Sequence, residues 1–327
     1  MKIITLNDHL KSIYGTKVYK LSLSSGCTCP NRDGKLSYGG CTFCSAMGSG
    51  DFILNGIPLQ QVPNVTQTTP LLPNASMLHA EYIQPDTHEQ LEYAKKLVAS
   101  KISANIPESE RKYIAYFQSF SGTYGDNDHL RKIYTEAISD DSVVTLSIGT
   151  RPDCISDECL DLLMELNKIK PVWIELGLQT IHENTALRIN RCYPLDVFED
   201  TYSRLKAAGI TVIVHMILGL PGESHEDMYA SMRYLAELSP SLDGIKLHLL
   251  HILKGTKLAE EYAAAPFHIM SLEEYIEVVV NCLTILPDET VIHRMTGDGP
   301  RRLLIEPLWS LDKKNVLNRL NKAIREH

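Results

Sequence analysis

The sequence predicts an α/β protein built as a partial (β/α)6 barrel with a C-terminal extension. Short runs rich in β-branched and aromatic residues recur at intervals of roughly 30 residues, with helical patterns between them. The helical pattern that ends at residues 207–209 leads directly into an apolar run, which is typical of a βαβ unit. The 327 residues fit one large α/β domain or two ordinary ones. A complete eight-unit barrel needs two more clear units than the sequence displays.

Seven segments have the composition of strands. The predicted strands are 18–23, 113–119, 143–148, 172–178, 211–218, 244–250 and 290–294. Segment 211–218 is a nearly continuous apolar run, as expected of a strand that is buried on both faces. In such a barrel the chemistry takes place at the carboxyl ends of the strands. The polar motifs considered below fall mostly at those ends.

Helices are predicted between the strands from the spacing of apolar residues. They span 89–100, 128–138, 157–166, 196–208, 225–238 and 272–286, with N-caps at Asp128, Ser156, Ser224 and Ser271. A further amphipathic helix is expected over 312–325, with its basic side chains turned outward. Residues 53–84 are rich in Pro, Thr, Asn and Gln and show no periodicity, so they are expected to form a loop insertion.

Composition and charge exclude several classes of protein. Hydrophobic residues make up 44% and charged residues 22%, which excludes a disordered or fibrous chain. No apolar stretch has the length of a membrane span, and the N-terminus lacks the apolar core of a secretory signal. We therefore expect a cytoplasmic protein with no membrane partner. The net charge is −8, yet the predicted extension, 301–327, carries +4 and the predicted barrel, 1–300, carries −12. A basic tail indicates either a solvated helix face or an anionic contact.

Eight cysteines are distributed unevenly. Cys154, Cys159, Cys192 and Cys282 are scattered and are expected in the core. The other four, Cys27, Cys29, Cys41 and Cys44, lie close together after a predicted strand, where clustered cysteines indicate a metal site.

Two kinds of metal site compete. All four clustered cysteines could hold zinc in a tetrahedron, although Cys27 and Cys29 point to opposite sides of an extended chain and Pro30 favours that extension. Alternatively, Cys29, Cys41 and Cys44 could hold a [4Fe–4S] cluster with one iron left open, and Phe43 would then lie beside it.

The pattern C-x11-C-x2-C with an aromatic residue before its last cysteine resembles the radical S-adenosylmethionine (SAM) superfamily. Its wide spacing and flanking sequence resemble the Elongator-catalytic-subunit-like branch, and more narrowly the YhcC/YtqA type of bacterial proteins. The resemblance covers most of the chain. The motifs that carry it are Cys29-Pro-Asn-Arg-Asp-Gly, Gly39-Gly-Cys-Thr-Phe-Cys, Gly48-Ser-Gly-Asp-Phe, Tyr116-Phe-Gln-Ser-Phe, Ser147-Ile-Gly-Thr-Arg-Pro-Asp-Cys, Glu175-Leu-Gly-Leu-Gln-Thr, Gly219-Leu-Pro-Gly-Glu, Lys246-Leu-His-Leu-Leu-His and His293-Arg-Met-Thr-Gly-Asp-Gly-Pro-Arg.

The resemblance implies a [4Fe–4S] cluster on Cys29, Cys41 and Cys44, with SAM chelated at the open iron and Cys27 as a spectator. Reductive cleavage of SAM then produces a 5′-deoxyadenosyl radical, with electrons from a reductant such as flavodoxin or ferredoxin.

The same resemblance assigns other cofactor contacts. Relatives often carry an acidic residue for the SAM amino group where this chain has Gly149, so Gln118, Thr150 or Arg151 is expected to compensate. The remaining contacts are Phe43 beside the cluster, Gln179 and His215 for the ribose, Arg191 for the SAM carboxylate, and Gly219 and Leu220 for the adenine.

Four further residues are candidates for catalysis. Lys246 and His248 share one face of a predicted strand, because side chains alternate with period two. If that face points into the barrel, they contact substrate or donate protons, and His251 follows them. Glu175 is the fourth candidate, with an ion pair inside the barrel as its alternative role.

For substrate, relatives of the YtqA type imply the wobble uridine of tRNA, whose 5-carboxymethylaminomethyl group would be converted towards aminomethyl. Salt-sensitive tRNA binding is then expected to involve Arg301, Arg302, Lys313 and Lys314. Two alternatives remain at this point. One is a radical SAM enzyme acting on a small metabolite, and the other is a non-enzymatic zinc-binding adaptor.

Overall fold

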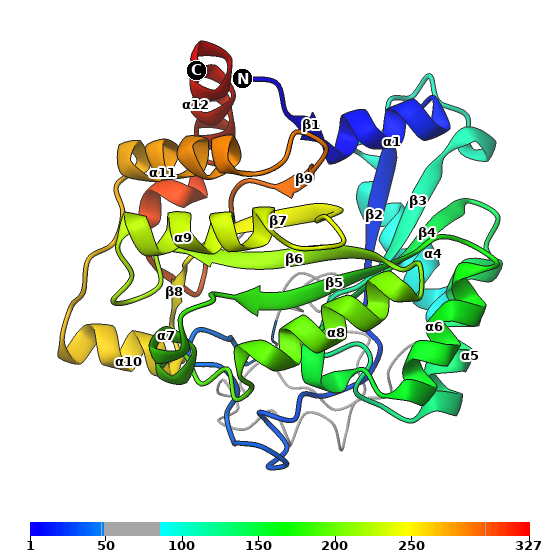
Figure 1. Ribbon diagram of the computed structural model, residues 1–327. Helices are drawn as coiled ribbons and strands as arrows, with labels where there is room; N and C mark the ends of the chain where they lie inside the picture. Colours follow the sequence, from blue (N-terminus) through cyan, green and yellow to red (C-terminus); the bar gives the residue numbers. More distant parts are fainter. Residues whose placement is uncertain (47, 49–85, 298) are drawn as a thin grey trace.

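A computed structural model describes residues 1–46, 48, 86–297 and 299–327, and the predicted insertion at 53–84 lies outside these residues. The fold is α/β, with a curled parallel sheet as predicted (Figure 1). The sheet has eight strands, in the order β1-β9-β7-β6-β5-β4-β3-β2, and each neighbouring pair is parallel. The strands are β1 (Ile4–Thr5), β2 (Val18–Leu23), β3 (Lys112–Phe117), β4 (Val143–Thr150), β5 (Val172–Gln179), β6 (Thr211–Leu218), β7 (Gly244–Leu249) and β9 (Val291–Arg294).

All seven predicted strands are present, and β2 and β6 have the predicted bounds. The sheet exceeds six units because β9 and β1 extend it beyond β7. The two residues of β1 are too few to produce a periodic pattern, so the sequence did not reveal this strand. β1 and β2 form the two edges of the sheet, and α1 (Leu6–Tyr14) connects them along the chain.

Helices follow the strands of the sheet. They are α4 (Thr87–Ala99), α5 (Asn127–Ser139), α6 (Asp157–Asn167), α7 (Glu183–Arg188), α8 (Leu195–Ala207), α9 (His225–Ala236), α10 (Lys257–Ala264), α11 (Leu272–Ile285) and α12 (Lys313–Glu326). Ser156, Ser224 and Ser271 cap their helices as predicted. The prediction of Asp128 as an N-cap was wrong, because Asp126 accepts the hydrogen bonds from the first turn of α5.

The core has three parts. The largest lies between the outer face of the sheet and helices such as α5, α8 and α11. A second cluster contains Val18, Ile114, Trp173 and Ile213 on the opposite face, packed against Leu10 of α1. It therefore fills the amino-terminal end of the barrel interior. The third lies beneath α10 and the antiparallel pair of β8 (Ile252–Leu253) and β10 (Leu304–Glu306).

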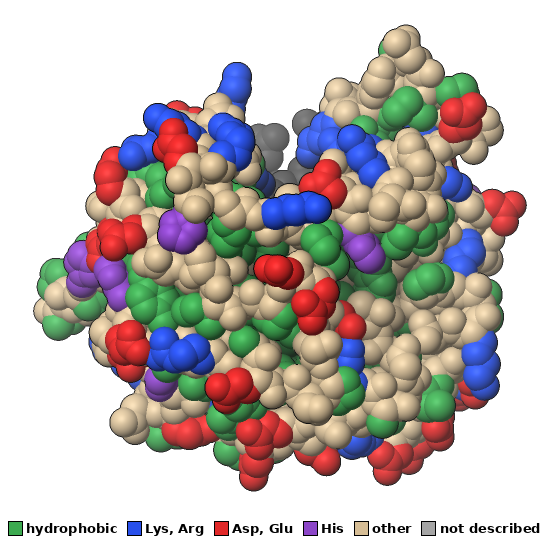
Figure 2. All heavy atoms as spheres, turned by 45° about the horizontal axis from the view of Figure 1, so that its top comes forward, with side chains coloured by type: hydrophobic (Ala, Val, Ile, Leu, Met, Phe, Trp, Pro, Cys, Tyr) green, Lys and Arg blue, Asp and Glu red, His purple; other side chains and the backbone are tan. Residues whose placement is uncertain are grey.

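Helix α12 packs against the body of the protein, as its apolar stripe predicted. Val316, Leu320 and Ile324 are buried in the main core, and Arg319 pairs with Glu273 of α11 at 2.7 Å. Figure 2 shows basic side chains mixed with acidic ones on this side of the molecule. Within the described residues, no helix is long and apolar enough to cross a membrane.

Candidate active site

A layer of polar side chains lies above the apolar floor of the barrel. Its centre is Glu175 on β5, whose side chain is fully buried. Lys20 of β2 donates to Glu175 Oε1 at 3.0 Å, and Ser147 of β4 donates to the same oxygen at 2.8 Å. His215 of β6 lies 2.9 Å from Oε2, and Lys246 of β7 donates to that oxygen. Five strands thus converge on one carboxylate, because alternate residues of each strand point inward.

Tyr116 of β3 and two further histidines complete this layer. Lys246 Nζ lies 3.1 Å from the hydroxyl of Tyr116 and 4.4 Å from the centre of its ring. The rings of His215 and His248 are 5.0 Å apart, and His293 of β9 packs against Trp173. Among the described residues, neither His248 Nε2 nor His293 Nδ1, both buried, has a hydrogen-bond partner. Orphaned buried nitrogens of this kind indicate a place where a ligand completes the bonding.

Burial and the shared carboxylate set the charges of this layer. Burial would raise the pKa of Glu175, but Lys20 and Lys246 outweigh it and hold the pKa well below its ordinary value. Burial lowers the pKa of Lys246 well below its usual range, with Glu175 opposing the shift. Burial, with Lys246 adding to it, lowers the pKa of His215 to about 4. Glu175 is therefore ionised and His215 neutral at physiological pH, and Lys246 is the amine most easily deprotonated.

The Cys29–Cys41 segment follows β2 at the carboxyl end of the barrel. Cys29 O accepts hydrogen bonds from the amides of Arg32 and Asp33, and Cys41 O accepts from the amide of Cys44 at 3.0 Å, so a turn begins at each cysteine. The side chain of Asn31 approaches Cys41 Sγ at 3.7 Å and donates to Asn190 O at 2.6 Å. This links the cysteine segment to the end of α7.

Cys27 is separated from the other three clustered cysteines. Its sulfur faces the carbonyls of Ser25 and Gly122 at 3.8 Å, within the main core. An added Cβ at Gly125 would lie 2.8 Å from this sulfur, so the core closes around it. A four-cysteine zinc site requires all four thiolates around one ion. This placement of Cys27 does not fit such a site.

Electrostatic interactions connect the thiols of Cys29, Cys41 and Cys44. Arg151 also interacts with the thiols of Cys29 and Cys41. Burial raises the pKa of Cys29. Burial together with Cys44 raises the pKa of Cys41 to about 12. Arg151 opposes both shifts. Within the described residues no three side chains converge to hold a single metal ion. In an iron–sulfur cluster each cysteine thiolate binds its own iron, so Cys29, Cys41 and Cys44 would each bind one iron of such a cluster. These thiols must release protons when iron binds.

Gln179 ends β5 at the barrel mouth. It has a left-handed backbone, with φ of 68°, and Tyr193 donates to its Oε1 at 3.2 Å. An added Cβ at Gly177 would lie 2.4 Å from Gln179 Nε2, so only glycine leaves room for the amide. The side-chain amide of Gln179 therefore lies over Gly177, between Gln179 and Glu175 in the E-x-G-x-Q motif.

The structure gives Arg191 different partners from the predicted SAM carboxylate. Its guanidinium is 1% exposed, lies over the ring of Tyr193, and donates to the carbonyls of Tyr193, Leu178 and Thr180 and to Glu183. Arg191 therefore holds the turn after β5 together. Two other basic residues lie near the cysteines: Arg151, which is paired with Asp153, and Arg32, which donates to Cys44 O at 3.5 Å.

Two other predicted residues lie away from the barrel interior. Thr150 shares a hydrogen bond of 2.6 Å with Thr123, because it alternates with the inward position of Gly149. His251 lies 3.1 Å from Ser310 and packs against Gly297 and Gly299, since the chain leaves the sheet after β7. This placement does not support Thr150 as a SAM contact or His251 as a catalytic residue.

The other predicted cofactor residues surround the mouth. Gln118 follows β3 opposite Gly149, and Phe43 packs on the third core cluster. Gly219 follows β6 with φ of 84° and donates its amide to Met228 Sδ at 3.2 Å, and Leu220 is buried. Cys154, Cys159 and Cys282 are buried as predicted, but Cys192 is exposed in a left-handed turn.

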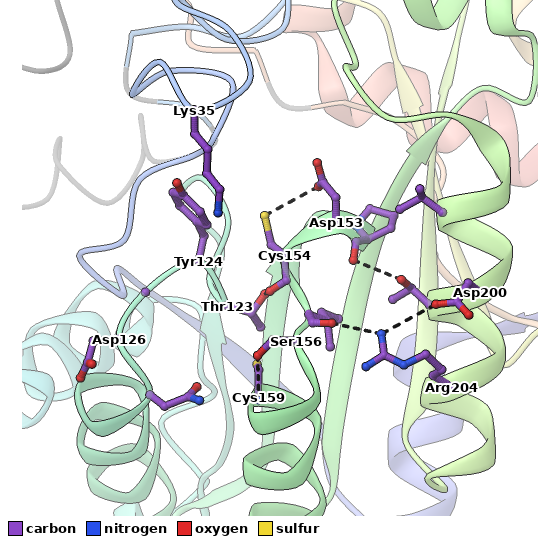
Figure 3. A pocket seen from close by; sticks show the side chains of 16 residues that line it. Lys35, Thr123, Tyr124, Asp126, Asp153, Cys154, Ser156, Cys159, Asp200 and Arg204 are labelled. Carbon is purple, nitrogen blue, oxygen red and sulfur yellow. Dashed lines mark hydrogen bonds and ion pairs between the residues drawn. The ribbon is translucent and has the colours of Figure 1, made fainter.

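A cavity of about 760 Å³ lies beside this site rather than within it (Figure 3). Its walls come from Tyr124 and Asp126 after β3, Asp153 and Cys154 after β4, and Arg204 of α8. None of the predicted site residues lines it. It is adjacent to the site through Asp153, the partner of Arg151.

Sequence reasoning missed Lys20, Tyr116 and Ser147 as members of the polar layer, whereas His293 was expected to close the barrel mouth over substrate or to form a structural turn. The side chain of each points to the inner face of its strand, as those of Glu175 and Lys246 do. A polar residue at alternate positions of several apolar strands was the available signal.

Comparison with known proteins agrees with this geometry. The family model "Radical SAM superfamily" matches residues 28–235, and the model "Radical_SAM C-terminal domain" matches residues 242–326. The chain is 40% identical over 320 residues to the uncharacterized protein YtqA of Bacillus subtilis, covering 98% of this chain and 88% of that protein. It is 34% identical over 315 residues to protein YhcC of Escherichia coli K12, covering 96% of this chain and 89% of that protein.

More distant similarity links the chain to Elongator proteins. Elongator complex protein 3 of Schizosaccharomyces pombe is 27% identical over 222 residues, which cover 67% of this chain and 39% of that protein. The solved archaeal Elp3 of Methanocaldococcus infernus has the same fold, with a TM-score of 0.62 at 19% identity, covering 77% of this chain and 60% of that one. The chain therefore belongs to the radical SAM superfamily, and it is a radical SAM enzyme whose cofactors are a [4Fe–4S] cluster and SAM.

Proposed function

We propose that this enzyme holds its cluster on Cys29, Cys41 and Cys44 and acts on the wobble uridine of tRNA, converting the 5-carboxymethylaminomethyl group towards aminomethyl. The cluster, once reduced by a donor such as flavodoxin or ferredoxin, supplies the cleavage of SAM that generates a 5′-deoxyadenosyl radical. Arg151 favours the thiolate forms of Cys29 and Cys41 that bind iron. Cys27, buried in the main core, has no part in this site.

SAM would lie across the mouth between the cysteines and the strand ends. Gln179 has the donor and acceptor groups that ribose hydroxyls require. The backbone after β6, at Gly219 and Leu220, would contact the adenine, and Gln118 and Arg151 would contact SAM on the cysteine side. The fold thereby orients a cofactor that carries the difficult chemistry.

The charge of the barrel interior is the observation that carries the substrate proposal. Lys20 and Lys246 share the single carboxylate of Glu175, and Arg294 adds its positive charge to the field around Tyr116 and His215. An incoming carboxylate favours the protonated form of Lys246 and is attracted to it. The carboxymethylamino group of the proposed nucleoside carries such a carboxylate. This interior is positive although the whole chain carries −8.

His248 and His293 offer polar atoms to the same ligand. Their unpartnered nitrogens are buried beside Lys246 and Trp173. Burial lowers the pKa of each well below its ordinary value, so both are neutral at physiological pH. A neutral imidazole can donate one hydrogen bond and accept another. These histidines can therefore orient the amine and the carboxylate of the substrate.

The test combines two readouts on the reconstituted enzyme. With SAM, a reductant and tRNA that carries the modified uridine, 5′-deoxyadenosine should form and the nucleoside should lose its carboxymethyl group in mass spectrometry. Cys29→Ala, Cys41→Ala and Cys44→Ala should abolish both readouts, and Cys27→Ala is the matched control that should retain them. Lys246→Met should abolish nucleoside conversion while retaining the iron content of the wild type.

Each failure has its own meaning. If all four cysteine variants lose metal equally, the three-cysteine assignment is wrong. If SAM is cleaved but the nucleoside is unchanged under every condition, the tRNA substrate is wrong, and a small metabolite takes its place.

A further inference from the structure

The long spacing between Cys29 and Cys41 builds a separate turn at the barrel mouth. Asp33 and Tyr38 form an antiparallel bridge, and the amide of Gly34 donates to Ser37 O at 3.2 Å. Lys35 and Leu36 lie at the tip of this turn and are exposed. The additional residues between the two cysteines therefore form a defined surface feature.

Tyr38 presents its ring largely to solvent, with a side chain that is 73% exposed. An added Cβ at Gly34 would lie only 2.5 Å from the ring, at its hydroxyl end. Gly34 has φ of 92°, and a glycine at this position permits both the turn and the close approach of the ring. The result is an exposed aromatic ring at the base of the turn.

The turn is anchored to its surroundings. The Asn190 side chain donates to Ser37 Oγ at 3.2 Å and to Gly40 O at 2.9 Å. Further along the segment, Phe43 packs on the third core cluster together with Leu258 of α10 and Ile305 of β10. One apolar cluster thus supports the cysteine segment, α10 and β10 as a unit.

Five exposed basic residues lie on or next to the cysteine segment, α10 and β10. Together they are called the mouth ridge. They are Lys35, Lys254, Lys257, Arg301 and Arg302.

Two contacts join parts of the ridge, while Lys35 lies with its ammonium over the ring of Tyr124. Lys257 Cε would lie 3.5 Å from a Cβ at Gly39, next to Tyr38, and the amide of Lys254 donates to Leu303 O at 2.7 Å, next to Arg302. Asp33 and Glu260 are exposed acids on the same segments, so the ridge retains a positive balance.

We propose that the mouth ridge and Tyr38 bind single-stranded RNA, with the phosphates on the cations and one base stacked on the tyrosine ring. Phosphates attract clustered cations, and an aromatic face binds any base without demanding a sequence. This inference rests on the proposed function, because it brings an RNA base to the mouth above Lys246. Helix α12, which carries the other basic residues, lies at the top of Figure 1, away from the cysteine segment and α10 at the bottom.

The test measures binding of a fluorescent anticodon stem-loop RNA by anisotropy over a range of salt concentrations. Lys254→Gln/Lys257→Gln removes two ridge cations, and Lys322→Gln/Arg325→Gln removes two cations near the C-terminal end of α12 as the matched control. Two lost phosphate contacts should lower the slope of log affinity against log salt by about 1.4 to 1.8 and weaken binding about 20-fold at 0.15 M salt. The control pair should bind as the wild type does, and thermal melting verifies that both fold.

A second series tests the stacking. Tyr38→Ala and Tyr38→Leu should weaken binding about 5- to 150-fold, because the stacked base is lost. Tyr38→Phe should retain wild-type affinity, since it keeps the ring. If Tyr38→Phe weakened RNA binding as much as Tyr38→Ala does, the stacking role of Tyr38 would be overturned.

Other outcomes overturn the inference. If the α12 pair weakens binding as much as the ridge pair, only the total charge matters and the ridge is not a site. If the ridge variants bind RNA normally but are reduced more slowly by flavodoxin, the ridge receives the reductant instead.

Failure of the proposed function is distinguishable from failure of the ridge. RNA bound through the ridge with no change in its nucleoside refutes the proposed reaction alone. A converted nucleoside together with unchanged binding by the ridge variants refutes the ridge alone.

Discussion

Replacing Glu175 with glutamine tests the central role assigned to its buried carboxylate. The carboxylate has no exposed surface and neutralises Lys20 and Lys246 from two sides. Glutamine keeps the shape but removes the charge, which leaves two ammonium groups facing each other across the barrel. Removal of one partner from a buried ion pair costs about 3–5 kcal/mol. We therefore expect Glu175→Gln to reduce the free energy of unfolding by about this amount.

Scanning calorimetry converts this expectation into a temperature. For 327 residues the entropy of unfolding is about 0.7 kcal/mol/K, so a loss of 3–5 kcal/mol lowers the melting temperature by about 4–7 °C. The deficit should shrink as the pH rises, because Lys246 has a folded-state pKa below its unfolded value and can lose its proton once the carboxylate is gone. The Glu175→Gln/Lys246→Met double variant should recover part of the loss.

Glu165→Gln is the matched control for this experiment. Glu165 pairs with Arg131 on the surface, and its side chain is 53% exposed, so its removal should shift the melting temperature by less than about 1 °C. The reasoning would be refuted if Glu175→Gln had the same melting temperature as Glu165→Gln. It would also be refuted if the loss of melting temperature in Glu175→Gln grew as the pH rises.

Three further predictions concern stability. His215 has a folded pKa of about 4, below its unfolded value near 6.5. Its contribution to the free energy of unfolding is therefore complete above pH 6.5 and is lost as the pH falls through 4. About 2 kcal/mol of this stability should be lost at pH 5. In the His215→Gln variant the melting temperature should therefore vary less with pH between pH 6.5 and pH 4. Leu320→Ala should cost about 2–5 kcal/mol by calorimetry because the side chain is fully buried, whereas Lys322→Ala in the same helix should cost under about 0.5 kcal/mol. Arg191→Lys should lower the melting temperature of the SAM-free protein by about 3–7 °C, since three carbonyls lose their donor; an unchanged value would assign Arg191 to ligand binding alone.

Local patterns were sufficient to predict most of the fold. Apolar runs located every strand of four residues or more in the parallel sheet, and Ser156, Ser224 and Ser271 marked the helix starts. Elements with little internal pattern were missed. The strand Ile4–Thr5 exists because it pairs with β9 at the far end of the chain, and α7 has only six residues. Their stability comes from tertiary contacts rather than from propensity.

In the candidate site, too, some residues could be predicted from local pattern and others could not. The three cysteines and the inward positions of Glu175, Lys246 and His248 follow from spacing and alternation, since both are properties of the chain itself. The roles of Arg191, Thr150 and His251 depend on what lies opposite them, which spacing cannot reveal.

The sequence by itself determined the superfamily and the parallel α/β architecture and predicted Cys29, Cys41 and Cys44 as cluster ligands, because each is encoded over short stretches of chain. Only the tertiary structure decided that Lys20 and Lys246 share Glu175, that Cys27 belongs to the core, and that the Cys29–Cys41 turn meets α10 and β10. These residues are far apart in sequence, and closure of the sheet into a partial barrel is what brings them together.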